Sequence, residues 1–302
     1  MANTAIQASV VIPCRNSAGT IGAAVRTALA QSVPPLEVIV VDDASTDDSA
    51  AVAAAAGARV ERLASRGNAG GARNRGIEVA RGDVLAFLDA DVEIAPDWLA
   101  LVQEAMAADP DVVAVGGRIV NGRPGLWGDL DYFLSHSEWM SPRAKACGTY
   151  PTMAVAYRRR AVGESRFPAI NWGEDTFFAL AVQARGGKVW YEPRIRIVHK
   201  HERLDRRRFW ERQVDMGRTL YWTRRHLDRP GRILFRFPVL LLLYPHLWIV
   251  LLRMVRAGLA VRALALFPWL VAGETARIVG FFHARADAGR GVEIVSGAAR
   301  AD

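Results

Sequence analysis

Short apolar runs alternate with helix-like segments along the first 120 residues. The runs are continuous, as in Val84-Leu85-Ala86-Phe87-Leu88, and many contain β-branched residues. Between them, apolar residues recur three and four positions apart, which is the spacing of an amphipathic helix. Strands that are apolar on both faces are typical of a parallel sheet covered by helices on both sides. The pattern therefore predicts an α/β fold with a Rossmann-like, mostly parallel central sheet flanked by helices.

Prolines and glycines mark where the predicted elements end, as Pro34-Pro35 and Gly57 do. We expect strands at residues 9–12, 36–41, 60–63, 84–88, 112–115 and 195–198. We expect helices at residues 20–31, 47–56, 69–80, 96–107, 176–184 and 206–225.

Polar clusters follow these strands, and ligands of such sheets bind beyond the carboxyl ends of the strands. An isolated Asp-X-Asp is more often a solvated strand end, and Asp43 alone could equally be a turn or cap residue. Four clusters at one edge instead predict a shared ligand site. The clusters are Pro13-Cys14-Arg15-Asn16, Asp42-Asp43-Ala44-Ser45, Gly67-Asn68-Ala69-Gly70-Gly71 and Asp89-Ala90-Asp91.

Asp89 and Asp91 are candidate groups for holding a divalent cation, because Mg²⁺ and Mn²⁺ prefer carboxylate and phosphate oxygens. The loop after the first strand is not Gly-x-Gly-x-x-Gly, and the chain has no Walker-type Gly-Lys-Ser/Thr loop. Nicotinamide-dependent and P-loop NTPase functions are therefore disfavoured.

In order and spacing, these motifs resemble those of the family 2 glycosyltransferases with the GT-A fold, across residues 8 to about 220. Three positions depart from the family: Ala44, Val92 and Thr152 stand where it often has Gly, a third acidic residue and Asn. The matching segments are Val10-Val11-Ile12-Pro13 with Arg15-Asn16, residues 40–47, residues 68–76, Phe87-Leu88-Asp89-Ala90-Asp91, Gly173-Glu174-Asp175 and Val198-His199-Lys200-His201.

The resemblance implies a nucleoside-diphosphate-sugar donor, a divalent cation (Mg²⁺ or Mn²⁺) and an inverting displacement. In the family pattern Asp43 would contact the base, Asp89 the ribose or the metal shell, and Asp91 the metal. A cation would neutralise the charge of the leaving diphosphate. The other expected donor-site residues are Pro13, Arg15, Asn16 and Arg73. Arg15 and Arg73 would reach phosphates or brace the acidic residues, although Arg73 could equally be a helix-surface arginine.

The acceptor side is expected just before the helix at 176–184. In family terms Asp175 is the general base that takes the proton of the acceptor hydroxyl, although an Asp at a helix start is often only a cap. Trp172 and Glu174 complete this side. Trp172 could stack on a sugar or pack in the core. The resemblance implies His199 as a metal ligand, with His201 as its competitor.

The C-terminal third is basic and apolar. Residues 1–200 hold 21 Lys+Arg and 22 Asp+Glu, whereas residues 201–302 hold 18 Arg and 9 Asp+Glu. Residues 237–252 carry no charge, but a helix of 16 residues is about 24 Å long, short of the ~30 Å hydrocarbon core. Because arginines flank this run on both sides, one span would violate the positive-inside rule, and a re-entrant or interfacial arrangement fits better. A true membrane span and a soluble helical hairpin are the alternatives.

We therefore expect a catalytic domain at 1–225, divided into a nucleotide-sugar half (about 8–117) and an acceptor half (about 118–225). A membrane-associating helical segment is expected at 226–286 and a frayed tail at 287–302. The two cysteines give no disulfide framework and are expected to be small buried residues, and the first residues lack the features of a signal peptide. We expect a cytoplasmic protein, peripheral to or re-entrant in the inner face of the cell membrane.

The expected function is a metal-dependent inverting glycosyltransferase. It would extend a glycan or lipid-linked acceptor in envelope polysaccharide or glycolipid synthesis, at an anionic membrane surface. Transfer to polyprenyl phosphate is the alternative enzyme. A basic nucleic-acid-binding protein is disfavoured, because the C-terminal arginines bracket leucines and form no basic stripe with interspersed aromatics.

Overall fold

The computed structural model describes residues 6–170, 173–200, 205–226, 233 and 236–290. The chain divides into two compact units. One holds Met1–Gly122 and Pro142–His201, and the other holds Arg123–Ser141 and Glu202–Ser296. The functional division at residue 225 stays a prediction, but the helix at 206–226 belongs to the second compact unit.

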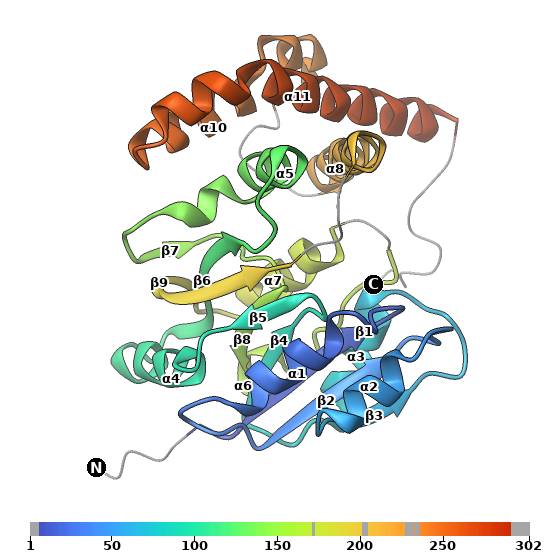
Figure 1. Cartoon of the computed structure of the whole chain (residues 1–302), viewed down its shortest axis with the longest axis vertical. Coiled ribbons are helices and arrows are strands. Elements are labelled where there is room, and N and C mark those ends of the chain that lie inside the picture. Colours follow the sequence, from blue (N-terminus) through green and yellow to red (C-terminus); the bar gives the residue numbers. More distant parts are fainter. Residues whose placement is uncertain (1–5, 171–172, 201–204, 227–232, 234–235, 291–302) are drawn as a thin grey trace. The chain divides into compact units, whose positions relative to one another are not determined.

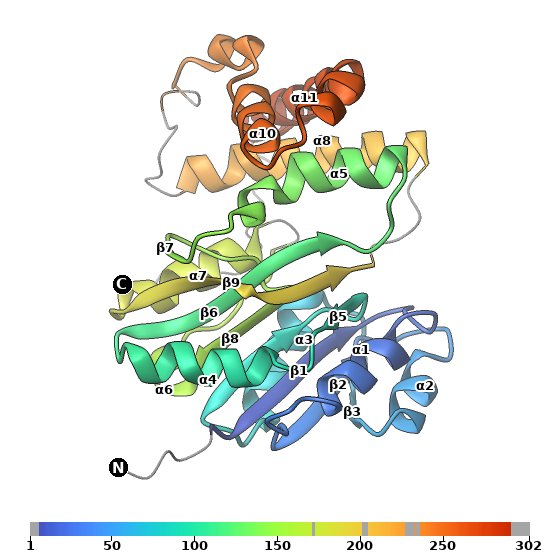
Figure 2. The same ribbon diagram turned by 60° about the vertical axis from the view of Figure 1, so that its left-hand side comes forward.

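A mixed sheet forms the centre of the first unit (Figures 1 and 2). Among the described residues its strand order is β3-β2-β1-β4-β8-β6-β9-β5, with β7 paired to β9. Strands β1–β4, β6 and β9 run in one direction, and β5, β7 and β8 run in the other. The strands are β1 Ala8–Cys14, β2 Glu37–Asp42, β3 Arg59–Arg62, β4 Val84–Leu88, β5 Val92–Ile94, β6 Val112–Asn121, β7 Lys145–Cys147, β8 Ala154–Arg158 and β9 Lys188–His199.

Helices cover both faces of this sheet, with α1, α2 and α4 on one face and α3, α6 and α7 on the other (Figures 1 and 2). Strands β2 and β4 are buried at every position, which explains why their sequences are continuous apolar runs. The expected α/β class is confirmed. The helices are α1 Ile21–Leu29, α2 Ser49–Ala55, α3 Ala69–Val79, α4 Trp98–Ala108, α6 Arg159–Val162 and α7 Glu174–Ala184.

The sheet contains three strands that were not predicted, β5, β7 and β8, and its strands β6 and β9 are longer than those expected at 112–115 and 195–198. Strand β8 lies antiparallel between β4 and β6. Strand β6 was expected at 112–115 but continues through Gly116 and Gly117 to Asn121. A Cβ on these glycines would collide with Tyr150 and Ile195 respectively, so the glycines permit close packing within a strand.

The cysteines are free in the structure. Cys14 is buried, and burial raises the pKa of its thiol to about 11. Cys147 is only partly buried, so the expectation of two buried thiols holds for Cys14 alone.

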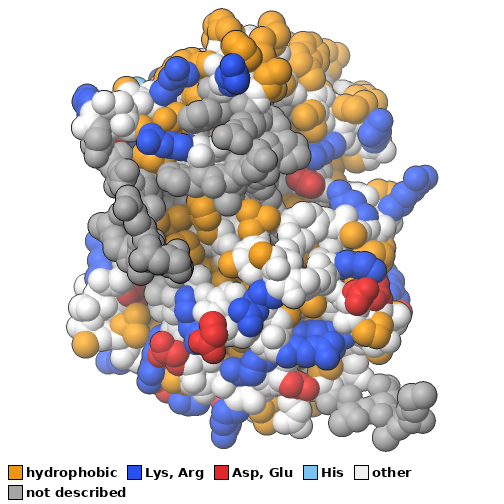
Figure 3. Space-filling view, turned by 180° about the vertical axis from the view of Figure 1, so that it is seen from behind, with side chains coloured by type: hydrophobic (Ala, Val, Ile, Leu, Met, Phe, Trp, Pro, Cys, Tyr) orange, Lys and Arg blue, Asp and Glu red, His pale blue; other side chains and the backbone are white. Residues whose placement is uncertain are grey.

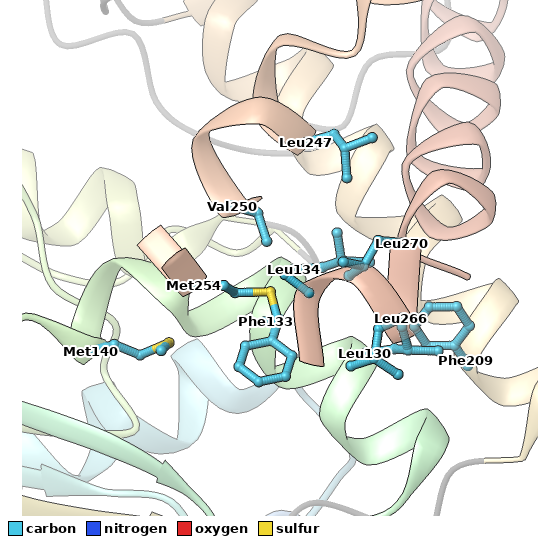
Figure 4. Close-up of a cluster of buried hydrophobic side chains, with 11 residues drawn as sticks. Leu130, Phe133, Leu134, Met140, Phe209, Leu247, Val250, Met254, Leu266 and Leu270 are labelled. Carbon is cyan, nitrogen blue, oxygen red and sulfur yellow. The ribbon is translucent and has the colours of Figure 1, made fainter. Parts of the chain in front are cut away.

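The described part of the second unit consists of helices, so the expected C-terminal apolar and basic helical extension is present. Its core joins α5, α8, α10 and α11 through a cluster that includes Phe133, Phe209, Met254 and Leu270 (Figure 4). The elements are α5 Leu126–His136, the 3₁₀ helices η1 Ser137–Met140 and η2 Pro238–Leu243, α8 Arg206–His226, α10 Pro245–Arg256 and α11 Ala260–Gly289.

Glycines bring two of these helices together. A Cβ on Gly217 of α8 would overlap the carbonyl of Arg277, and a Cβ on Gly280 of α11 would overlap the carbonyl of Val214. The backbones of α8 and α11 are therefore in direct contact.

The apolar C-terminal sequence is not one straight helix. Tyr244, with φ of 49° and ψ of 48°, separates η2 from α10. A second apolar run in the sequence, at residues 263–273, lies within the longer α11. By length and composition alone, the stretches Pro238–Arg256 and Ala260–Gly289 are each sufficient to cross a membrane.

Candidate functional site

The predicted site residues gather at one edge of the sheet in the first unit. Strands β1, β2, β4 and β9 run in the same direction, so their carboxyl ends share this edge. Arg15, Asp43 and Asp89 follow the first three of these strands, and His199 is the last residue of β9. Parallel strands therefore bring together residues that are up to 184 positions apart in the sequence (199 minus 15).

Asp43 is buried, and hydrogen bonds hold both its side chain and its backbone carbonyl. It is 4% exposed, and its Oδ1 accepts a hydrogen bond from the backbone N–H of Gly67 at 2.6 Å. The guanidinium of Arg15 donates to the backbone carbonyl of Asp43 at 2.9 Å and lies 4.0 Å from Oδ2. Arg15 thus braces the acidic residue, one of the two roles expected for it.

Asn16 joins the loop after β1 to the loop after β2. Its Oδ1 accepts a hydrogen bond from the Thr46 N–H at 2.9 Å, and its own N–H donates to Ser45 Oγ at 3.0 Å. Asn16 and Ala44 both have left-handed backbones, with φ of 46° and 52°. Glycine adopts this conformation without strain, which explains its frequency at position 44 in the family. Pro13 lies within β1, opposite Val41.

Asn68 caps the start of α3, a role that was not predicted from the sequence. Its Oδ1 accepts a hydrogen bond from the Gly71 N–H at 2.8 Å, and its Nδ2 donates to the Ile170 carbonyl at 3.4 Å. An Asn before a helical segment is a recognisable N-cap signal, but the long-range bond is not local information. Together these bonds fix the first turn of the helix that carries Arg73.

Arg73 connects the two acidic clusters. It is 4% exposed, and it donates to Asp89 Oδ1 at 2.8 Å and to Glu174 Oε1 at 3.2 Å. Its guanidinium carbon also lies 5.4 Å from the centre of the Phe167 ring. Burial alone would lower the pKa of Arg73, but the carboxylates of Asp89 and Glu174 outweigh it and raise that pKa above its usual value. Arg73 is therefore not a helix-surface arginine.

Glu174 and Asp175 begin α7 directly after Gly173, whose φ is 79°. Burial raises the pKa of the Glu174 carboxyl, and the neighbouring Asp175 raises it further. Burial likewise raises the pKa of Asp175, against the effect of Arg73. Asp175 Oδ1 accepts a hydrogen bond from the Thr176 N–H at 2.6 Å. A carboxylate with a raised pKa is a stronger base, so the site holds a group suited to accept a proton.

Asp91 and His199 face each other across the β5–β9 pair. Asp91 Oδ2 lies 3.3 Å from His199 Nε2, and the Asp91 carbonyl accepts a hydrogen bond from the Lys200 N–H at 2.8 Å. His199 is buried, whereas the Asp91 side chain is 31% exposed. Mn²⁺ accepts one carboxylate together with one imidazole, whereas Mg²⁺ prefers oxygen ligands and would be held mainly by Asp91.

These two residues would supply only part of a coordination shell. Within residues 6–170, 173–200, 205–226, 233 and 236–290, no three His, Cys, Asp or Glu side chains converge on one point. Such a cation would take its remaining ligands from phosphate or water. Trp172 and His201, also expected near the site, lie outside the described residues.

Comparison with known proteins gives a family match. The model of "Glycosyl transferase family 2" matches residues 9–165. The succinoglycan biosynthesis protein ExoO of Rhizobium meliloti is 44% identical over 119 residues, which are 36% of this chain and 34% of that protein. The glucosyl-dolichyl phosphate glucuronosyltransferase of Haloferax volcanii is 34% identical over 100 residues, 32% of either chain. The matches thus span about a third of the length of these curated relatives.

Solved structures share the fold. The mannosyltransferase PcManGT from Pyrobaculum calidifontis, in complex with GDP-Man and Mn²⁺, gives a TM-score of 0.66 at 21% identity. The alignment covers 93% of this chain and 88% of that one. The expected GT-A fold is confirmed.

Proposed function

Because the chain belongs to glycosyl transferase family 2, we propose that it moves a sugar from a nucleoside-diphosphate sugar to a hydroxyl of a glycan or lipid-linked acceptor. The observation that carries this proposal is the position of Arg73 between Asp89 and Glu174. One buried arginine links the acidic strand end, where the donor would bind, to the helix start that bears Asp175.

The donor side would be formed by Asp43, Arg15 and Asp89. Asp43 is a buried carboxylate whose Oδ1 is engaged by Gly67, so it offers a fixed acceptor to an N–H donor of a nucleobase. Asp89 is 30% exposed on its side chain and is held in place by Arg73, which leaves it available to a ribose hydroxyl. Because the side chain of such an acceptor is already fixed, it loses no conformational freedom when the ligand binds.

Asp175 would act as the general base. It would take the proton from the acceptor hydroxyl while that oxygen attacks the anomeric carbon, and the nucleoside diphosphate would leave on the opposite side. One such displacement inverts the configuration of the anomeric carbon. The raised pKa of Asp175 supports this role, because a carboxylate with a higher pKa is a stronger proton acceptor.

Asp91 and His199 would hold a divalent cation, Mg²⁺ or Mn²⁺. When bound, such a cation supplies the positive charge that stabilises a leaving diphosphate. Their 3.3 Å separation supports the assignment, since both side chains already point at one another.

The acceptor is proposed to belong to envelope polysaccharide or glycolipid synthesis, at the inner face of the cell membrane. The relatives in succinoglycan biosynthesis and in glucosyl-dolichyl phosphate glucuronosyl transfer support this pathway class. The two apolar helical stretches support a membrane location weakly.

A donor-binding experiment tests the proposal. The full chain is heated with UDP-, GDP- and dTDP-sugars, with Mn²⁺ or with EDTA, because a ligand that binds only the folded state raises the melting temperature. We expect one nucleotide class to stabilise the protein only when Mn²⁺ is present. If no sugar nucleotide of any base stabilises it under either condition, the proposed function is wrong.

A further inference from the structure

Helix α10 is apolar on two faces. Leu247, Val250 and Met254 lie three or four residues apart and are buried in the helical core (Figure 4). The outward face carries Trp248, which is 60% exposed, together with Leu252. A surface helix in water normally has a polar outward face. Among the described residues, the outward face of α10 instead consists mainly of large apolar side chains.

The same character continues on both neighbouring elements. Leu243 of η2 is 66% exposed, and Val261 and Leu264 in the first turns of α11 are 85% and 79% exposed. In the view of Figure 3, hydrophobic side chains gather at the top, with Lys and Arg side chains next to them. Soluble monomers seldom expose many large apolar side chains on consecutive elements. We call the outward residues Leu243, Trp248, Ile249, Leu252, Val261 and Leu264 the apolar patch.

The segment that bears the apolar patch is basic, and two of its four arginines pair with carboxylates of neighbouring elements: Arg262 pairs with Asp129, and Arg253 lies 3.7 Å from Glu138. Residues 236–273 contain Arg236, Arg253, Arg256 and Arg262, and no Asp, Glu or Lys. A second copy of the chain docking about a two-fold axis would bring these arginines close to one another, which is unfavourable. An anionic lipid surface satisfies the apolar side chains together with Arg236 and Arg256.

The backbone of η2 and α10 argues against a crossing by that stretch, and the longer α11 carries Glu274 and Arg277 in polar contacts with its neighbours. Tyr244 interrupts the stretch between η2 and α10, and α10 has 12 residues, or about 18 Å, against a hydrocarbon core of ~30 Å. Polar groups also lie between the helices: Glu274 Oε1 is 2.7 Å from His246 Nδ1, and Arg277 donates to Gln213 Oε1 at 2.7 Å. A helix pair built in this way can bury one face in lipid while its other face stays packed on protein.

We propose that the apolar patch inserts into one leaflet of an anionic bilayer to partial depth, without crossing it. This inference rests on the membrane location in the proposed function, and it adds the surface and the lipid class. Trp248 and Ile249 enter the acyl region, and Arg236 and Arg256, which are both exposed, contact the headgroups.

The test uses the full chain and vesicles of phosphatidylcholine alone or mixed with phosphatidylglycerol. We expect the protein to sediment with the mixed vesicles and much less with the neutral ones. A Trp248→Ser/Ile249→Ser double variant should bind at least about tenfold more weakly, because two large apolar side chains leave the lipid. The matched control is Leu36→Ser, which changes a 41% exposed leucine in the first unit and should bind like the unchanged protein.

Three results would overturn the inference. Vesicle binding that the double variant retains would assign the contact to another surface. Protein that high salt and carbonate fail to release, and only detergent extracts, would indicate a spanning helix. Absence of vesicle binding, with a dimer that the double variant abolishes, would make the partner a second copy. Donor binding with Mn²⁺ is measured on the same samples, so failure of the proposed function shows there independently of the vesicle result.

Discussion

Replacing Arg73 with methionine tests whether this arginine holds the two acidic clusters together. The change removes the donors to Asp89 and Glu174 but keeps most of the apolar volume. Breaking a buried ion pair costs about 3–5 kcal/mol, because an uncompensated charge stays behind. The Asp89 and Glu174 side chains are 30% and 18% exposed, so water replaces part of the lost interaction. We expect the free energy of unfolding to fall by about 2–4 kcal/mol.

Urea unfolding measures this loss, and the same helix supplies the control. Arg75 is 43% exposed on its side chain and pairs with Glu61 at 3.1 Å and Glu78 at 3.3 Å. Exposed pairs contribute about 0–1 kcal/mol, so Arg75→Met should change stability little although it also breaks two ion pairs. Arg73→Met should in addition weaken sugar-nucleotide binding, because Asp89 loses its brace. Equal losses of stability in the two variants would refute the reasoning.

Three further predictions concern the metal, the base and the helical unit. Asp91→Asn should keep the fold but lose metal-dependent donor binding in a thermal-shift assay, and EDTA-insensitive binding in that variant would remove Asp91 from the metal site. Asp175→Asn should leave donor affinity within a few-fold while transfer falls roughly 10²–10⁴-fold, the usual contribution of a general base, and a parallel loss of donor affinity would make Asp175 structural. Because burial raises the pKa of Asp175, its ionisation destabilises the fold as the pH rises through that pKa, so this variant should also gain stability over the unchanged protein at neutral pH but not below about pH 4. Gly280→Leu should lower the melting temperature because its side chain would overlap the carbonyl of Val214, whereas Gly289→Ala, with open space around it, should not.

The position of the site at one edge of the sheet was predictable, because the carboxyl ends of parallel strands lie at the same edge. A buried strand such as Val84–Leu88 has a local signature, and its carboxyl end must meet those of its parallel neighbours. Asp43 and Asp89 could therefore be placed at one edge without knowing a single long-range contact.

The partners of Arg73 could not be predicted in the same way. Glu174 is 101 positions away, and whether an arginine on α3 points to solvent or inward depends on which helix covers that face. Strand β8 could not be predicted from the sequence either. Its sequence, Ala-Val-Ala-Tyr-Arg, is a weak strand signal, and its pairing with β4 and β6 determines its conformation.

The chain path through the helical unit affects any attempt to shorten this protein. Helix α5 comes before strands β7, β8 and β9 in the sequence. It nevertheless packs with α10 and α11, which come after those strands. A stop codon at the expected boundary near residue 225 would remove Leu247, Val250 and Leu270 and leave the apolar side of α5 in water. Such a fragment should aggregate. A shorter soluble enzyme would also need residues 123–141 excised and Gly122 joined to Pro142 by a short linker, so the helical unit is removable only as two separate pieces of the gene.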